Sequence, residues 1–319
     1  RALFTMTTPT TSVERNPNIY ADFFAASELS SALTRKDIRK ASETLGRVEA
    51  RFMVDYYYTM QRDRIRFDNQ VRSMTKSGEP NMILDHLASQ AAKREEIIKK
   101  ALDDYTSTDR VGTWLRSICG IGPVTAAGLL AYIDIERAVT AGAIWKLAGL
   151  VPGVEWNKGE KRPWNAKLKC LMFKIGESFV KTSNKEASFY GKIYKERKEL
   201  ETRRNENGDF AEQAAKELAS KNYAKNTPTY AALSAGRLSP AHIHARARRY
   251  AVKLFLSHLH EVMYLVILKK APPSPYAISI LEHAHRIPVP ELGAIKDFID
   301  PVADDIETPF DDEMGMGSE

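Results

Sequence analysis

The sequence predicts an all-α protein in which a long antiparallel coiled-coil arm precedes a helical globular domain. Three observations indicate this fold class. Apolar residues recur three or four positions apart over long stretches of the chain. No stretch alternates apolar and polar residues for long enough to predict a strand. A glycine-proline turn at 120–123 joins two apolar helical segments, which is typical of a helix-hairpin-helix.

Charge is distributed unevenly along the 319 residues. Lys and Arg number 47 against 41 Asp and Glu, for a net charge of +6. Residues 297–319 hold nine acids and no base, so the preceding 296 residues carry a net charge of +15. This asymmetry indicates that residues 1–296 bind a polyanion and that residues 297–319 form an acidic tail. We expect the tail to be disordered and to compete with nucleic acid for the basic part of the protein.

The composition predicts a cytoplasmic protein. No apolar run approaches the ~20 residues that span a membrane, so no membrane partner is expected. Cys119 and Cys170 lie in apolar helical contexts without metal-binding spacing, which fits a reducing cytosol. Residues 1–33 lack the charged-then-apolar order of a signal peptide, and we expect them to form a flexible leader.

Residues 34–106 predict the arm. Thr34 has the side chain of an N-cap, and a long helix is expected to run from it to a break at 76–80. Its apolar residues predict a coiled-coil seam: Ile38, Ala41, Leu45, Val48, Phe52, Tyr56, Met60, Phe67, Val71 and Met74. A second helix has its own stripe: Leu84, Ala88, Ala91, Ile98, Leu102 and Tyr105. Such an arm has few neighbours to cover its seam, so we predict that it pairs with a second copy as a homodimer or lies on a partner.

Residues 114–133 predict the helix-hairpin-helix, with Pro123 at the first position of its second helix. The unpaired backbone N–H groups at that helix N-terminus lie beside glycines that allow close approach, which favours a phosphate. The residues predicted to hold a nucleic-acid phosphate are Gly120, Ile121, Gly122 and Thr125. The alternative is a tight helical turn packed in a core.

A basic and aromatic stretch covers 154–198, after a short helix at 143–150. It combines twelve bases and five acids with interleaved aromatic residues. This mixture suits single-stranded nucleic acid, because rings stack on bases and cations contact phosphates. The alternative is a helix with an aromatic core stripe, the role that we expect for Phe173 and Phe179. The loop residues that packing does not require are Lys158, Lys161, Arg162 and Trp164.

Two helices are expected in the last part of the globular domain, which we bound at 107–296. One lies near 210–220, and a long one begins at Pro240. The stripe expected in the core of the long helix is Ile243, Ala247, Tyr250, Leu254 and Val262. The arginines of its first half should then project to the surface. A short helix is also expected at 277–283.

The motifs of several chemistries are missing. Six of the seven histidines form three pairs separated by one residue: His242 with His244, His258 with His260, and His283 with His285. Residues two apart on a helix face different sides, so we predict no metal site. The hairpin glycines are not followed by Gly-Lys-Ser or Gly-Lys-Thr, and no adjacent acidic strands are predicted, so no nucleotide loop or RNase H-like nuclease is expected. We predict no catalytic residues and no cofactor.

The segment GIGPVTAAGLLAYI followed by WKLAGLVPG is similar to the helix-hairpin-helix half of the bridge-RNA-guided insertion-sequence transposases. In that family a nucleophilic serine follows shortly after the LVP segment. Here the matching position has Asn157-Lys158-Gly159, and no serine occurs between Val154 and Phe173. The N-terminal acidic catalytic domain of the family is also missing. The resemblance therefore implies the fold without recombinase activity.

A second resemblance concerns the Nop domain of box C/D guide-RNA proteins, which also follows a coiled-coil arm. Residues 165–181 resemble its basic helix, which grips a kinked guide RNA. FYGKIY at 189–194 resembles its Y-G-x-I-Y element, and the helix from 236 onward resembles its closing helix. With both resemblances combined, the chain resembles the Tas proteins of TIGR systems, which use short guide RNAs to bind DNA. The chain has no room for a fused nuclease, so it resembles the nuclease-less type.

This resemblance implies a Nop-like domain that binds a small guide RNA and target DNA in a prokaryotic or phage-encoded system. The residues expected to bind RNA are Lys158, Lys161, Arg162, Trp164, Asn165, Lys167, Lys169, Lys174, Lys181, Lys192, Arg246 and Arg249. Two alternatives remain. One is a helix-hairpin-helix DNA-binding or recombination protein that acts without RNA. The other is a structural coiled-coil dimer whose charge serves only solubility.

Overall fold

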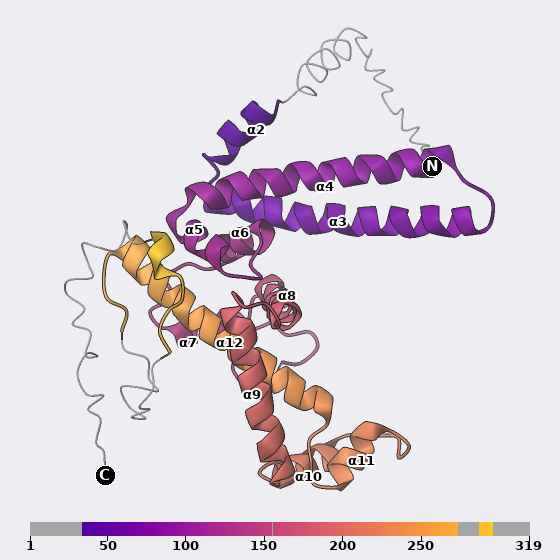
Figure 1. Ribbon diagram of the computed structural model, residues 1–319, viewed down its shortest axis with the longest axis vertical. Coiled ribbons are helices and arrows are strands. Elements are labelled where there is room, and N and C mark those ends of the chain that lie inside the picture. The colour runs from indigo at the N-terminus through magenta and orange to yellow at the C-terminus, as the bar shows by residue number, and fades with distance from the viewer. Residues whose placement is uncertain (1–33, 155, 274–286, 296–319) are drawn as a thin grey trace, which may run out of the picture.

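The computed structural model describes residues 34–154, 156–273 and 287–295 (Figure 1). Every regular element over these residues is a helix, which confirms the all-α fold class. Figure 1 shows a two-helix arm at one end, a central group of helices beneath it, and a pair of long helices running to the opposite end. The predicted leader, the helix at 277–283 and the acidic tail lie outside the described residues.

The arm consists of α3 (Arg47–Lys76) and α4 (Met82–Thr108), which run side by side in opposite directions (Figure 1). A separate helix, α2 (Arg35–Ser42), precedes them. The single long helix expected from Thr34 is therefore wrong. The chain turns after α2, and Gly46, in an extended conformation, forms the N-cap of α3. Glycine is among the weakest helix formers, so a helix break is favourable there.

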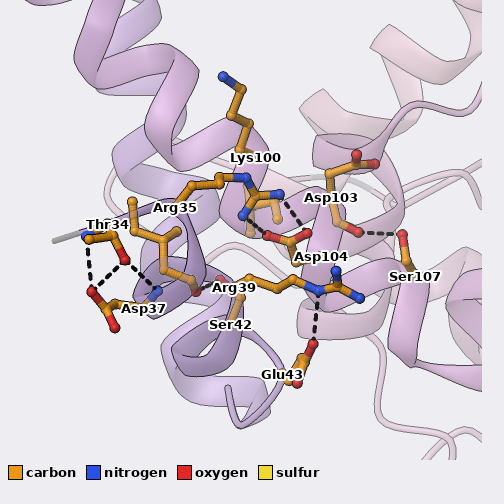
Figure 2. Close-up of polar contacts among 12 residues, drawn as sticks. Thr34, Arg35, Asp37, Arg39, Ser42, Glu43, Lys100, Asp103, Asp104 and Ser107 are labelled. Atoms are coloured by element: carbon orange, nitrogen blue, oxygen red, sulfur yellow. Dashed lines mark hydrogen bonds and ion pairs between the residues drawn. The ribbon is translucent and has the colours of Figure 1, made fainter.

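Polar contacts hold α2 against α4 (Figure 2). The Arg35 guanidinium forms a two-pronged ion pair with the Asp104 carboxylate, and its Nη2 lies 2.7 Å from Oδ1. Thr34 is the N-cap of α2, as predicted. Its hydroxyl accepts from the Asp37 N–H at 3.3 Å, and the Asp37 carboxylate accepts from the Thr34 N–H at 3.0 Å. The capped helix is thereby fixed at the base of the arm.

The seam of α3 differs from the predicted one over its first half. Its buried residues are Ala50, Val54, Tyr57 and Met60, and of these only Met60 belongs to the predicted seam. The predicted residues Val48, Phe52 and Tyr56 are 72%, 70% and 41% exposed. Both sets repeat every three or four residues, so periodicity alone does not choose between them. The choice comes from the helices that pack on α3, which are α4 and α6; Val54 lies in ordinary packing contact with Gly128 of α6.

The stripe predicted on α4 is correct where that helix meets the body, since Ala91, Ile98 and Leu102 are buried. A charged residue, Glu95, interrupts the stripe and is 8% exposed. Its carboxylate accepts a hydrogen bond from Arg64 of α3 at 2.5 Å. Because a buried carboxylate without a partner is costly, this pair favours one register of α3 against α4.

The main core lies among the central helices and the two long ones. Their bounds are α5 (Arg110–Ser117), α6 (Pro123–Tyr132), α7 (Ala141–Leu147), α8 (Ala166–Thr182), α9 (Phe189–Glu206) and α12 (Pro240–Met263). Phe255 of α12 is fully buried at the centre of this core. Its ring centroid lies 6.1 Å from Trp114, 5.5 Å from Phe179 and 5.2 Å from Tyr190. Aromatic packing therefore joins α5, α8, α9 and α12.

A small second core lies at the far end of α9 and α12. Helices α10 (Ala211–Ser220) and α11 (Pro228–Ser234) form it, which confirms the helix predicted near 210–220. The buried residues of this core are Phe210, Ala214, Leu233, Leu238 and Ile243. Asn205 of α9 holds its edge by donating to the Leu238 carbonyl at 3.0 Å and accepting from the Leu238 N–H at 2.8 Å.

Helix α12 buries a wider face than its predicted stripe. Ile243, Ala247 and Val262 are buried as expected, and so are Ala251, Phe255 and Leu259. Two predicted core residues are wrong, since Tyr250 is 37% exposed and Leu254 is half-buried. The Tyr250 ring is instead covered from outside by the Arg197 guanidinium, 4.5 Å from its centroid. Helices pack on several sides of α12, so burial is not confined to one stripe.

The apolar character of α12 continues into a π-helix, η1 (Tyr264–Leu268). Together, 240–268 are long and apolar enough to cross a membrane by length and composition alone. This corrects the expectation that no apolar run approaches that length. In the most apolar window, however, 61% is buried inside the protein, as in a core helix.

The segment 287–295, with a short 3-10 helix η2 (Leu292–Ile295), returns to the main core. The Trp114 indole Nε1 donates to the Pro290 carbonyl at 2.8 Å. Val289 and Ile295 are buried, at 8% and 1% exposure. This segment therefore covers α5, the first helix of the predicted hairpin.

Candidate nucleic-acid interface

Helix α8 buries an apolar side and exposes its lysines. Its buried residues are Leu168, Leu171, Met172, Ile175, Gly176 and Phe179. Its exposed lysines, which we name together the α8 face, are Lys167, Lys174 and Lys181 on one side of the helix and Lys169 on another. The predicted RNA contact Asn165 is the N-cap, and its Oδ1 accepts from the Lys167 and Leu168 N–H groups at 3.0 Å each. The cap fixes the start of the helix that carries these lysines.

The two phenylalanines of α8 have different positions. Phe179 is fully buried, as expected for a packing residue. Phe173 is 56% exposed, so its predicted place in the core is wrong. The Arg248 guanidinium of α12 lies 4.3 Å from its ring centroid. The stem of Arg248 also crosses Gly176, where a Cβ would approach it to 2.7 Å.

The loop before α8 carries an aromatic cluster. The rings of Trp156 and Trp164 meet edge to face with centroids 6.4 Å apart. The Arg162 guanidinium lies 4.8 Å from the Trp156 ring centroid. Lys158 and Lys161 are exposed on the same loop. The four loop residues predicted to bind RNA are therefore neighbours along one surface segment.

Trp164 has a defined packing role. It is half-buried, and the Lys169 ammonium lies 4.1 Å from its ring centroid. On another side the ring meets Gly149, where a Cβ would lie 2.9 Å from Trp164 Cγ. Gly149 has a φ of +65°, so a larger residue there would be strained as well as crowded.

The arm approaches the α8 face. Lys167 forms an ion pair with Asp55 of α3. The same carboxylate accepts a hydrogen bond from the Tyr132 hydroxyl at 2.6 Å. The Lys174 ammonium lies 3.4 Å from the ring centroid of Tyr58, and burial lowers its pKa. Two of the four lysines thus contact α3 directly, which positions the arm relative to α8.

The arginines of α12 were predicted to project to the surface, but two of them form ion pairs with acids of other helices. Arg246 Nε donates to Glu201 at 3.0 Å, and Arg248 pairs with Glu177. Glu201 is 1% exposed, so its charge requires such a partner. Arg249 alone of these three is exposed. Arg246 is therefore a structural cation, and Arg249 keeps the predicted position.

The predicted phosphate site at the hairpin is partly occupied by the protein itself. Gly120, with a φ of +99°, accepts a hydrogen bond from the Ser178 hydroxyl at 2.6 Å through its carbonyl. Ile121 is buried. The Gly122 N–H donates to the Thr125 hydroxyl at 3.0 Å, and this hydroxyl lies 2.8 Å from the Gly122 carbonyl. These contacts fit the packing alternative, and a phosphate at this turn stays a prediction.

Other cations lie beyond the α8 face. Lys192, a predicted RNA contact, is exposed near the start of α9. Three residues not singled out from the sequence, Lys195, Lys198 and Arg203, line an open groove along α9. Glutamates are interspersed with Lys and Arg along this helix, so the local sequence did not indicate a basic surface there. Only the folded helix shows which charges share a side.

The histidine pairs point to separate partners. The His258 Nδ1 lies 2.8 Å from the Tyr190 hydroxyl, whereas the His260 Nε2 lies 2.9 Å from the Ala138 carbonyl. No group of three or more His, Cys, Asp or Glu suited to a metal is found among the described residues. The pair nearest the C-terminus lies outside them.

These features define an all-α protein. Its central part contains a lysine-rich helix, a loop with two tryptophans and a helical hairpin. Residues 112–190, about a quarter of the chain, match the model of the Transposase IS116/IS110/IS902 family. The matched segment begins in α5 and ends at the start of α9. It supports a transposase-related protein, in agreement with the first resemblance. No curated protein and no solved structure matches the chain.

Proposed function

We propose that this protein binds a small guide RNA and uses it to bind DNA, without cutting the DNA itself. The observation that carries the proposal is the α8 face beside the Trp156 and Trp164 loop. Lys167, Lys174 and Lys181 are seven residues apart on one side of α8 and can contact phosphates, and the aromatic loop beside Lys169 can stack on unpaired bases. In other guided systems the protein holds the backbone and base pairing reads the target.

The second candidate is a DNA-binding or recombination protein that uses its helical hairpin without RNA. The match of residues 112–190 to a transposase family favours it. The hydrogen bonds that fill the hairpin turn weigh against the hairpin as its main phosphate site. The α8 face could still serve DNA, so the kind of nucleic acid that copurifies decides between the two.

The test is to coexpress the full chain with the DNA that flanks its gene and to purify it at low salt. We expect an absorbance ratio at 260 and 280 nm that is raised by nucleic acid, lowered by RNase and unaffected by DNase. Sequencing of the extracted RNA should give one short species. Loss of the signal with DNase alone would establish the second candidate, and protein free of nucleic acid would contradict both.

A further inference from the structure

An open groove of about 700 Å³ runs along α9. It begins at Val180 and Ser183, at the end of α8, and follows α9 to Arg203. Lys181, the last lysine of the α8 face, lies between these two residues in sequence. The groove therefore begins at the end of α8 where the α8 face also ends.

The groove keeps a positive charge. Lys195, Lys198 and Arg203 line it with one acid, Glu199. No ion pair of these three cations is found within the part of the chain that the structure describes. Lys195 donates to the Asn184 side chain at 2.6 Å, which leaves its charge uncompensated. Two neighbouring arginines of α9, by contrast, form ion pairs within the protein.

Arg197 and Arg204, on other sides of α9, are used inside the protein. Arg197 pairs with the buried Glu201 at 2.5 Å, and Arg204 pairs with Asp209 at 2.9 Å. The groove cations therefore stand apart from those that stabilise the fold. Their charge is available to a polyanion.

The floor of the groove is rigid. Tyr194 is 5% exposed, and its hydroxyl lies 2.8 Å from the His244 Nδ1 of α12. The two rings also meet edge to face at 5.6 Å. Ser183 and Thr202 add hydroxyl groups to the lining. From Tyr194 to Arg203 the helix rises ~14 Å, which is long enough to lie along more than one phosphate of a strand.

We propose that the α9 groove binds the sugar–phosphate backbone of an RNA segment that leaves the α8 face, with Lys195, Lys198 and Arg203 as phosphate contacts. This inference rests on the proposed function, because it extends the same RNA path. The groove offers cations and hydroxyls but almost no aromatic surface, so it should bind the strand without selecting its bases.

The test uses the full chain, freed of nucleic acid, and a fluorescein-labelled 20-nucleotide oligouridylate. Binding is followed by anisotropy across a salt series. The variant Lys198→Ala/Arg203→Ala should flatten the log–log salt slope by about 1.4, at ~0.7 per contact. Lys174→Ala/Lys181→Ala on the α8 face should do the same, and the four substitutions together should double the effect. Lys36→Ala/Lys40→Ala on α2 is the matched control and should change nothing.

Glu199→Gln removes the acid of the groove and should tighten binding about twofold at low salt. Misfolding cannot imitate this gain. If the α9 variants leave the slope and the affinity unchanged while the α8 variant flattens the slope, the groove inference is wrong and the proposed function stands. If wild-type protein does not bind the oligonucleotide and carries no RNA when purified, both are wrong.

Discussion

Lys167 and Asp55 form an ion pair that joins the lysine-rich helix α8 to α3 of the arm, 112 residues away in sequence. The Asp55 carboxylate also accepts the Tyr132 hydroxyl of α6. One acid of α3 thus contacts two other helices, α6 and α8. It also compensates a cation that we expect to contact RNA, so the free protein and the RNA compete for Lys167.

Asp55→Asn should therefore strengthen RNA binding. The amide still accepts from Tyr132, but it no longer compensates Lys167. Both side chains are substantially exposed, at 30% and 62%, so stability should fall by less than ~1 kcal/mol. RNA affinity should rise about twofold at low salt and be unchanged at high salt. Asp68→Asn, which removes a similar pair with Arg64 on the same helix, is the control. Weaker binding by Asp55→Asn alone would contradict this competition.

The exposed stripe of α3 sharpens the homodimer prediction. Val48 and Phe52 are 72% and 70% exposed, so Val48→Glu/Phe52→Glu should fold with a nearly unchanged melting temperature. If the stripe pairs with a second copy, where each side chain contributes ~1.5 to 3 kcal/mol on burial, the variant should be monomeric. Sedimentation velocity measures this directly. The control is Ile65→Glu, on another side of the helix, which should remain dimeric. A wild-type protein that is monomeric at micromolar concentration would contradict the homodimer prediction.

Trp164 tests the role of the aromatic loop. If a base stacks on it, Trp164→Ala should weaken RNA binding by ~1 to 3 kcal/mol equally at all salt concentrations. Gly149→Ala should reproduce part of the loss, because its Cβ would displace the ring. By contrast, Lys161→Ala/Arg162→Ala/Lys169→Ala should flatten the salt slope by about two units. A lower melting temperature with intact RNA affinity would leave Trp164 with its packing role only.

His260 should make the fold sensitive to acid. Burial lowers the pKa of His260 from its usual value, so the unfolded chain binds a proton more readily than the folded one. The contribution of this residue to stability is full above pH ~6.5 and is lost as the pH falls toward its lowered pKa. Unfolding free energy should drop by up to ~1.4 kcal/mol per pH unit in that window. His260→Gln should reduce this slope in urea melts, whereas His86→Gln, at an exposed position, should not. An unchanged slope in His260→Gln would show that other groups cause it.

Local sequence was sufficient for many helix boundaries and for the fold class. Thr34, Asn165 and Ser239 are N-caps because their side chains accept from the first helical N–H groups, an interaction that needs only neighbouring residues. The lysines of α8 also follow from local spacing, since a helix with one apolar side places its charges on the other. The transposase resemblance likewise came from a continuous stretch.

Tertiary contacts decided which of two equivalent patterns is buried and which cations are free. Val48, Phe52 and Tyr56 have the same spacing as the true seam, and only packing of α3 against α4 and α6 buries Val54 instead. Arg246 and Arg203 look alike in sequence, yet the first lies against the buried Glu201 and the second lines a groove. Sequence determined where helices form because caps and periodicity act within a few residues. Contacts between residues far apart in the chain determined which charges remain available, because a charge is compensated only by what the fold brings near it.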